Sequence, residues 1–156
     1  MRISLIAIGD RMPKWVNDAV ADYIARYPRE WHFSLNALPP AARHKSCTTA
    51  EILDIEGDKL LRAAQHHSLL IALDERGECL TSRQFSLQLS QWQTQSEAVA
   101  LLIGGADGLS SRCREAAHQT WSLSSLTFPH AIARLILVEQ LYRAWSLLAN
   151  HPYHRD

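Results

Sequence analysis

The chain has 156 residues, of which 47% are hydrophobic and 21% charged, and its 16 basic and 16 acidic residues give a formal net charge of zero. This length favours one domain with a sizeable core. Zero net charge excludes the broadly basic surface of a nonspecific nucleic-acid binder, so any RNA contact must be a local patch. Such a patch is plausible because 13 of the basic residues are Arg, whose planar guanidinium binds phosphate and stacks on bases.

The chain has three cysteines, Cys47, Cys79 and Cys113, which are far apart and form no Cys-x-x-Cys pair. This spacing predicts free thiols in a reducing compartment and no metal site. The apolar run that precedes Gly9 is too short for a signal peptide, and no segment is long and apolar enough to span a membrane. The sequence therefore predicts a cytoplasmic protein.

Short aliphatic runs alternate with longer amphipathic ones, a pattern typical of an α/β protein with a mainly parallel sheet covered by helices. Strands are expected at 2–9, 32–38, 68–74, 98–104 and 120–126. Helices are expected at about 13–27, 48–65, 82–95, 110–119 and 129–150. Thr48 and Glu51 have the spacing of a capping box, which marks the start of the second helix.

The connector at 38–49, "LPPAARHKSCTT", carries two prolines and then Arg43, His44 and Lys45. It is the one candidate for a mobile loop in the sequence. Two interpretations stay open. It is either a solvated link between a strand and a helix, or a basic loop that contacts the phosphate backbone of RNA.

The stretch "VALLIGGADGLSSR" predicts a buried strand that ends at Gly104-Gly105, a turn through Gly108, and a helix capped by Ser110 or Ser111. Glycines at a strand end let the backbone approach a ligand, and the helix start offers free N–H donors, although a tight turn alone also explains them. The loop lacks the Lys of a phosphate-binding loop, and it comes too late for a dinucleotide fingerprint. A cofactor of another kind fits better.

Two further strand ends are expected to face the same region. Asp74 closes "SLLIALD" and is either a turn residue or a ligand to a ribose. The stretch "WSLSSLTFPH", 121–130, could hold an adenine ring through its backbone, with Leu123 and Leu126 as apolar walls, or be an ordinary strand with one buried face.

The last helix carries a broad apolar stripe that must be covered by the sheet, by a second copy of the chain, or by both. The stripe comprises Ile132, Leu135, Ile136, Leu141, Trp145 and Leu148. Glu139 and Arg143 are four residues apart and predict an ion pair. The chain then ends in "NHPYHRD". This segment is either a flexible tail or a tail whose aromatic, imidazole and guanidinium side chains have a function.

The stretches "LLIGGADGLS", "WSLSSLTFPH" and "YRAWSLLANHPYHR", together with the opening "ISLIAIGDRMPKWV", resemble the ribosomal RNA large subunit methyltransferase H family of the SPOUT superfamily, over essentially the whole chain. The resemblance implies one SPOUT domain over 1–156, a C-terminal trefoil knot and a homodimer. It also implies transfer of the methyl group of S-adenosylmethionine to N3 of a pseudouridine in helix 69 of 23S rRNA, on the assembled ribosome. A catalytically inactive RNA-binding module and a transferase with another substrate are the alternatives.

The resemblance also implies site residues. The cofactor site comprises Leu73, Gly104, Gly105, Leu123, Ser124, Ser125, Leu126, Thr127 and Phe128. The catalytic, substrate-side residues are Arg143, Tyr153, His154 and Arg155, and the tail is expected to reach the cofactor pocket of the other subunit. His154 is a reasonable acceptor for the N3 proton because histidine titrates near neutrality, although a water or an Arg could serve.

Overall fold

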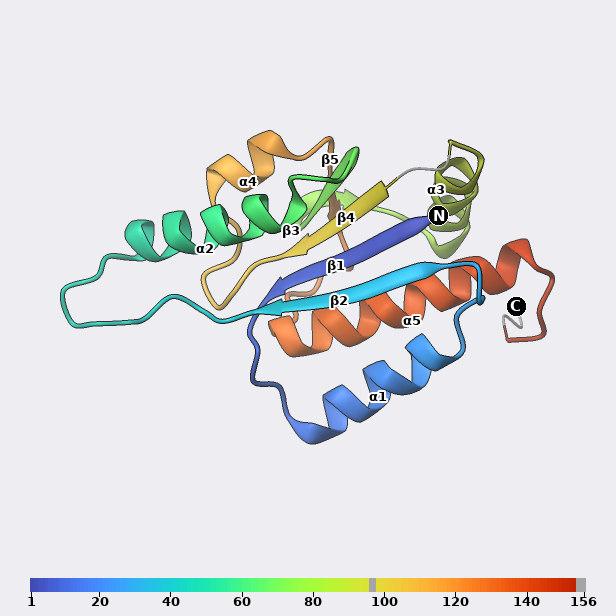
Figure 1. Ribbon diagram of the computed structural model, residues 1–156, viewed down its shortest axis with the longest axis horizontal. Coiled ribbons are helices and arrows are strands. Elements are labelled where there is room, and N and C mark those ends of the chain that lie inside the picture. Colours follow the sequence, from blue (N-terminus) through green and yellow to red (C-terminus); the bar gives the residue numbers. More distant parts are fainter. Residues whose placement is uncertain (96–97, 154–156) are drawn as a thin grey trace.

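The computed structural model describes residues 1–95 and 98–153, in which strands and helices alternate from β1 to α5 (Figure 1). The elements in chain order are β1 (Arg2–Ile8), α1 (Lys14–Ala25), β2 (His32–Leu38), α2 (Thr49–Ala64), β3 (Leu69–Cys79), α3 (Ser82–Gln95), β4 (Ala98–Ile103), α4 (Ser111–Ala116), β5 (Gln119–Ser122) and α5 (His130–Leu148). The predicted α/β class is confirmed.

The strands of the described chain form one sheet in the order β2-β1-β4-β3-β5, and neighbouring strands pair in parallel. In register, Leu101 of β4 lies between Leu5 of β1 and Ile71 of β3. Parallel strands are covered by helices on both faces, which explains why β4 is a continuous apolar run and why β1 is apolar from Ile3 to Ile8 except for Ser4. Their carboxyl ends all reach the same edge of the sheet, where the ligand-binding loops are expected.

Alternate side chains of the central strands enter two separate cores. Leu5 and Leu101 belong to a core shared with α1, α3 and α5. Ile6 and Leu102, one residue further along, belong to a second core with α2 and α4. The period of two residues in a strand therefore places three helices on one face of the sheet and two on the other.

Two helix starts have the caps that their sequences predict. Thr48 Oγ1 accepts from the Glu51 N–H at 3.2 Å and the Glu51 carboxylate accepts from the Thr48 N–H at 2.8 Å, which completes the predicted capping box of α2. Ser110 Oγ accepts from the Cys113 N–H at 3.1 Å and caps α4. Of the two serines considered, Ser110 is the cap.

The predicted strand at 120–126 is wrong beyond Ser122. The Ser122 hydroxyl donates to the Ser124 carbonyl at 2.7 Å, and Ser124 Oγ accepts from the Leu126 N–H at 2.9 Å. These side-chain bonds compete with ladder bonds, so the alternating Ser-Leu pattern produces a turn. The structure also extends β3 to Cys79 and ends α4 at Ala116, where the chain turns back to pair with β3.

The apolar stripe predicted on the last helix is only partly correct. Leu141 is fully buried, but Ile132, Leu135, Ile136 and Trp145 are half-buried and Leu148 is exposed. Besides Leu141, the residues of α5 that fill the core are Leu137, Val138, Tyr142 and Ala144, none of which belongs to the predicted stripe. The shift arises because α5 packs against α1 and α3 as well as the sheet, so its buried face points between them.

We expect the same substitution to have different effects at two neighbouring positions of α3. Leu89 is 0% exposed in the main core, whereas Leu87 is 62% exposed. Leu89→Ala removes core contacts and leaves a cavity, so it should lower the free energy of unfolding by about 2–5 kcal/mol. Leu87→Ala should change it by less than about 0.5 kcal/mol. Urea denaturation of both variants measures the difference, and equal losses would contradict the placement of α3.

Candidate functional site

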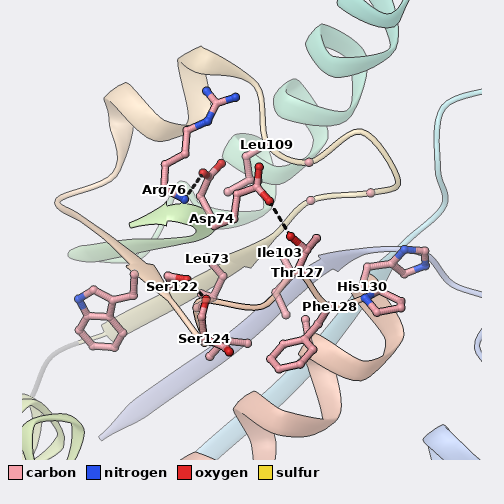
Figure 2. A pocket seen from close by; sticks show the side chains of 18 of the residues that line it. Leu73, Asp74, Arg76, Ile103, Leu109, Ser122, Ser124, Thr127, Phe128 and His130 are labelled. Atoms are coloured by element: carbon pink, nitrogen blue, oxygen red, sulfur yellow. Dashed lines mark hydrogen bonds between the residues drawn. The ribbon is translucent and has the colours of Figure 1, made fainter. Parts of the chain in front are cut away.

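A cavity of about 690 Å³ lies over the carboxyl ends of β4 and β5 and beside the part of β3 that extends past its pairing with β4 (Figure 2). Its walls come from residues of these strands, from the residues that follow β4 and β5, and from the start of α5. They are Leu73, Asp74, Glu75, Arg76, Ile103, Gly104, Gly105, Ala106, Asp107, Gly108, Leu109, Arg114, Trp121, Ser122, Leu123, Ser124, Leu126, Thr127, Phe128, Pro129, His130 and Ala133. Both the volume and the position are those of a small-molecule site in an open α/β sheet.

The cavity brings together nearly all of the predicted cofactor residues. Those that line it are Leu73, Gly104, Gly105, Leu123, Ser124, Leu126, Thr127 and Phe128. Ser125 is exposed and does not line the cavity, because it lies on the outer side of the turn after β5. Leu126 is 70% exposed, so it lies at the edge of the cavity. The apolar wall predicted at this position is therefore exposed to solvent in the free protein.

The glycines of the turn after β4 have separate structural reasons. A Cβ at Gly104 would collide with the backbone carbonyl of Gly108, so the turn can close only without a side chain there. Gly108 has φ +83, a left-handed conformation that favours glycine, and its N–H donates to the Gly105 carbonyl at 3.1 Å. A tight turn is thus sufficient to explain both glycines, and the same turn forms a wall of the cavity.

The expected role of the next helix start is wrong. Helix α4 has only six residues, and the Ser110 side chain already occupies the N–H of Cys113 at its first turn. From this segment only Leu109 and Arg114 line the cavity. The free N–H donors expected at this helix therefore do not face the cavity.

Charged side chains of both signs line the cavity, and of these only Asp74 was singled out from the sequence. Asp74 lies within β3, at the register shift between Leu73 and Glu78, so the expected turn is an irregularity inside a strand. Its Oδ1 accepts from the Arg76 N–H at 3.0 Å and its Oδ2 lies 3.5 Å from Arg114. The Glu75 carboxylate accepts from the Thr127 hydroxyl at 3.1 Å. Carboxylates and guanidiniums on one rim suit a ligand that carries both an ammonium and a carboxylate. Glu75 and Arg76 were not named as site residues from the sequence. Their position directly after the predicted strand 68–74 was the one feature that could have indicated them.

Connector 38–49 is held against the glycine turn. Arg43 pairs with Asp107 at 2.5 Å across the two loops, and the buried Ala41 N–H donates to Glu56 of α2 at 3.0 Å. Lys59 donates to the Pro39 carbonyl at 2.8 Å. The connector is therefore anchored at several points, while His44 and Lys45 are exposed.

Two predicted substrate-side residues lie together, but away from the cavity. Arg143 pairs with Glu139 at 2.9 Å, which confirms the predicted ion pair, and its guanidinium lies 5.2 Å from the ring centre of Tyr153. The Tyr153 hydroxyl donates to Glu139 at 3.0 Å and lies 3.0 Å from the Tyr23 hydroxyl. Burial, followed by these hydrogen bonds, raises the pKa of Tyr153 above its ordinary value. His154 and Arg155 lie outside the described residues.

The two groups of candidate residues occupy opposite ends of α5. Ala133 lines the cavity, and Arg143 follows ten residues later, which corresponds to about 15 Å along a helix. In Figure 1 the carboxyl ends of the strands lie at one side of the molecule and the C-terminal end of α5 at the other. One chain does not bring the described substrate-side residues to its own cavity.

The fold and the cavity define an α/β protein with a cavity of small-molecule size over the carboxyl ends of a parallel sheet. Solved structures with this fold include a "probable methylase family protein" from Haemophilus influenzae Rd KW20, with TM-score 0.62, 15% identity, and coverage of 99% of this chain and 70% of that one. A "Probable Methyltransferase" from Bordetella pertussis Tohama I has TM-score 0.56, 15% identity, and coverage of 92% and 95%. At these identities they show the fold alone.

Sequence comparison identifies the family. A family model described as "Predicted SPOUT methyltransferase" matches residues 1–154. Ribosomal RNA large subunit methyltransferase H of Thioalkalivibrio sulfidiphilus is 47% identical, with complete coverage of both chains, and the protein of the same name from Methylococcus capsulatus is 43% identical over 99% of this chain and 100% of that one. The chain belongs to the ribosomal RNA large subunit methyltransferase H family of SPOUT methyltransferases, and the resemblance seen in the sequence is confirmed.

Within residues 1–95 and 98–153 no group of three or more His, Cys, Asp or Glu side chains is placed to hold a metal ion. Cys47, Cys79 and Cys113 are free. None of the helices in the described chain is long and apolar enough to cross a membrane.

The tyrosine contacts predict an alkaline loss of stability. Because the fold raises the pKa of Tyr153, it favours the neutral phenol; this stabilisation is complete below about pH 10, the ordinary pKa of tyrosine, and is lost as the pH rises above it. Tyr153→Phe should therefore lose less unfolding free energy than the wild type between about pH 9 and pH 11. Urea denaturation at both pH values tests this, and equal losses would contradict it. Tyr27, whose pKa burial also raises, is present in both proteins.

Proposed function

We propose that the protein transfers the methyl group of S-adenosylmethionine to N3 of a pseudouridine in helix 69 of 23S rRNA, acting on the assembled ribosome. The observation that carries the proposal is the cavity at the strand ends, which is lined by eight of the nine cofactor residues expected from the family resemblance. The printed name of the relatives, ribosomal RNA large subunit methyltransferase H, supports a large-subunit RNA substrate.

The residues of the cavity fit S-adenosylmethionine. Leu73, Leu123, Leu126 and Phe128 offer apolar surface for the adenine ring, and the side-chain-to-backbone bonds of the turn after β5 fix the peptide groups beside it. Asp74 and Glu75 on the rim suit the ammonium of the methionyl part, and Arg76 and Arg114 suit its carboxylate. The absent side chain of Gly104 leaves the turn compact beside the ligand.

The chemistry requires few protein groups. When bound, the cofactor supplies an electrophilic methyl group on a sulfonium. The chain must exclude water from it, align the acceptor nitrogen, assist loss of the imide proton and stabilise the resulting anion. Arg143, Tyr153, His154 and Arg155 are proposed for the substrate side, with Arg143 and Arg155 stabilising the anion or holding a phosphate.

A homodimer would complete the site. In one chain Tyr153 and Arg143 lie at the far end of α5 from the cavity, so they can meet a cofactor only in another subunit. The half-buried Ile132, Ile136 and Trp145 and the exposed Leu148 offer apolar surface for such a contact. Tyr153 would then anchor the tail by packing on its own chain, and the residues after it would reach the partner subunit.

The C-terminal knot belongs to the same proposal. Trp121 of β5 pairs with both Leu73 and Glu78 of β3, so the residues between them leave β5 and rejoin it. A Cβ at Gly77 would fall 2.5 Å from the Trp121 carbonyl carbon, which shows how closely the two segments pass. In a knotted chain, close passages of this kind are expected where the C-terminal segment crosses an earlier strand.

A cytoplasmic location follows from the proposed ribosomal substrate.

Two glycine variants test the cofactor site. Gly104→Ala forces the turn to open, so S-adenosylmethionine affinity should fall by more than about tenfold, whereas Gly108→Ala meets no atom and costs only about 1 kcal/mol of stability. Calorimetry measures the affinity, and methyl transfer to large ribosomal subunits measures the activity. Binding without transfer to any RNA would indicate a transferase with another substrate. No binding by the wild type would indicate an inactive RNA-binding module.

Mixed dimers test whether the tail acts across subunits. A chain that ends at Tyr153 keeps its cavity but lacks the tail, and Gly104→Ala keeps the tail but lacks the cavity. After random exchange half of the dimers are mixed and each has one complete site, so the mixture should recover about a quarter of the wild-type transfer rate. With S-adenosylmethionine well below the weakened Kd of Gly104→Ala, each variant alone should keep less than about a tenth of the wild-type rate. A mixture that stays inactive, although tagged subunits show exchange, would mean that the tail serves its own chain.

A further inference from the structure

A second cavity, of about 450 Å³, lies at the carboxyl end of β1, next to the cofactor cavity. It is lined by Ile8, Gly9, Asp10, Arg11, Met12, Pro39, Pro40, Arg43, Glu56, Gly105, Ala106 and His130. Gly105, Ala106 and His130 line both cavities, so the two spaces share one wall. A ligand in the second cavity would lie beside a cofactor in the first.

The second cavity contains a buried carboxylate that is only half satisfied. Glu56 is 2% exposed, and its Oε1 accepts from the Ala41 N–H at 3.0 Å. Its Oε2 has no hydrogen-bond partner among the described residues. A Cβ at Gly105 would lie 2.7 Å from this oxygen, so the glycine keeps the wall between the carboxylate and the turn thin. A buried acceptor without a donor is costly, which indicates a ligand with an N–H group.

The lining of the second cavity combines charged side chains of both signs with rigid apolar surface. Arg11 is exposed and has no ion-pair partner among the described residues, while Arg43 is held by Asp107, and Asp10 precedes Arg11 in the chain. Pro39 and Pro40 supply rigid apolar surface. A guanidinium, proline rings and a carboxylate in one cavity match the phosphate, ring and N–H edge of one nucleotide.

His130 occupies the boundary between the cavities. It is the first residue of α5, it is half-buried, and its side chain makes no hydrogen bond with the described residues. A Cβ at Gly9 would lie 3.5 Å from the imidazole ring, which places the ring against the end of β1. Figure 2 shows His130 at the end of the cofactor cavity away from Ser122 and Asp74.

We propose that the second cavity receives the acceptor nucleotide of the RNA and that His130 is the catalytic residue that accepts its proton. This inference rests on the proposed function. The imidazole nitrogen takes the proton of the acceptor N–H, the nitrogen electron pair forms the N–CH₃ bond, and the S–CH₃ electron pair stays on sulfur as a thioether. The imidazolium then returns its proton to water.

Three of the carboxylates that line the two cavities are already engaged. Asp74 lies against Arg114, Asp107 pairs with Arg43, and Glu75 accepts from Thr127. The charged and titratable groups that face His130 across the two cavities are Asp10, Arg11, Arg43, Glu56, Asp74, Glu75, Arg76, Asp107 and Arg114. All of them remain when His130 is replaced, so a pH response that disappears with the imidazole belongs to it.

His130→Asn tests the role, with His66→Asn, an exposed residue after α2 that lines neither cavity, as its matched control. We expect His130→Asn to bind S-adenosylmethionine within about twofold of the wild type and to lower single-turnover methyl transfer by about 10²–10⁴-fold. A pH dependence of the wild-type rate should be absent in the variant. His66→Asn should match the wild type in all three measurements.

Several outcomes would overturn the inference. One is an unchanged rate and pH profile in His130→Asn, and another is a parallel loss of cofactor affinity and transfer, which would make His130 a cofactor contact only. Loss of the pH response in His154→Asn instead would assign the proton to the tail. If the wild type transfers no methyl group to RNA, the proposed function itself fails, a result distinct from an active wild type with an unaffected variant.

RNA binding without catalysis provides an independent test of the second cavity. Arg11→Met removes the unpaired guanidinium that lines it, whereas Arg29→Met removes an exposed guanidinium at the other end of the sheet, after α1. Affinity for the isolated RNA hairpin should fall with Arg11→Met, and the slope of log affinity against log salt should decrease by about one. Arg29→Met should leave both unchanged. Equal effects of the two variants would contradict a nucleotide site at the end of β1.

Discussion

The position of β4 between β1 and β3 is the constraint on which the site depends. Residues 99–102 of β4 are buried on both faces and pair on both sides, so the strand has almost no freedom to shift along the sheet. A slip of one residue would exchange Leu101 and Leu102 between the two cores. Because this strand is fixed, the glycine turn that follows it is fixed relative to the ends of β1 and β3.

The glycine turn in turn separates two cavities. The end of β3 and the turn after β5 lie on one side of it, and the end of β1 with the connector lies on the other. Gly104 is required by the close approach of Gly108, and Gly105 by the close approach of Glu56. Without these side chains the two cavities adjoin, and Gly105, Ala106 and His130 line both. A direct transfer needs the reacting atoms of two ligands to be in contact, and adjoining cavities can bring two ligands that close.

The sequence predicted those parts of the fold that depend on neighbouring residues. The strands β1, β2 and β4, the capping box of Thr48 and the glycine turn follow from local patterns and are confirmed. The predicted strand at 120–126 failed because serine hydroxyls bond to the adjacent backbone, an outcome that hydrophobic alternation does not reveal. Arg43–Asp107 and Tyr23–Tyr153 join residues 64 and 130 positions apart, and no local pattern indicates them.

A net charge of zero still allows local positive charge, because only some of the arginines are paired with carboxylates. Asp74, Asp107 and Glu139 each hold one Arg near a proposed site, which fixes the direction of that guanidinium and lowers its local charge. Arg11 has no such partner in the described chain, and it lines the second cavity. Arg76, which lines the first cavity, likewise has no ion-pair partner among the described residues. For the proposed RNA target, free guanidiniums beside shaped cavities favour one binding place, whereas a broad basic surface would bind RNA anywhere.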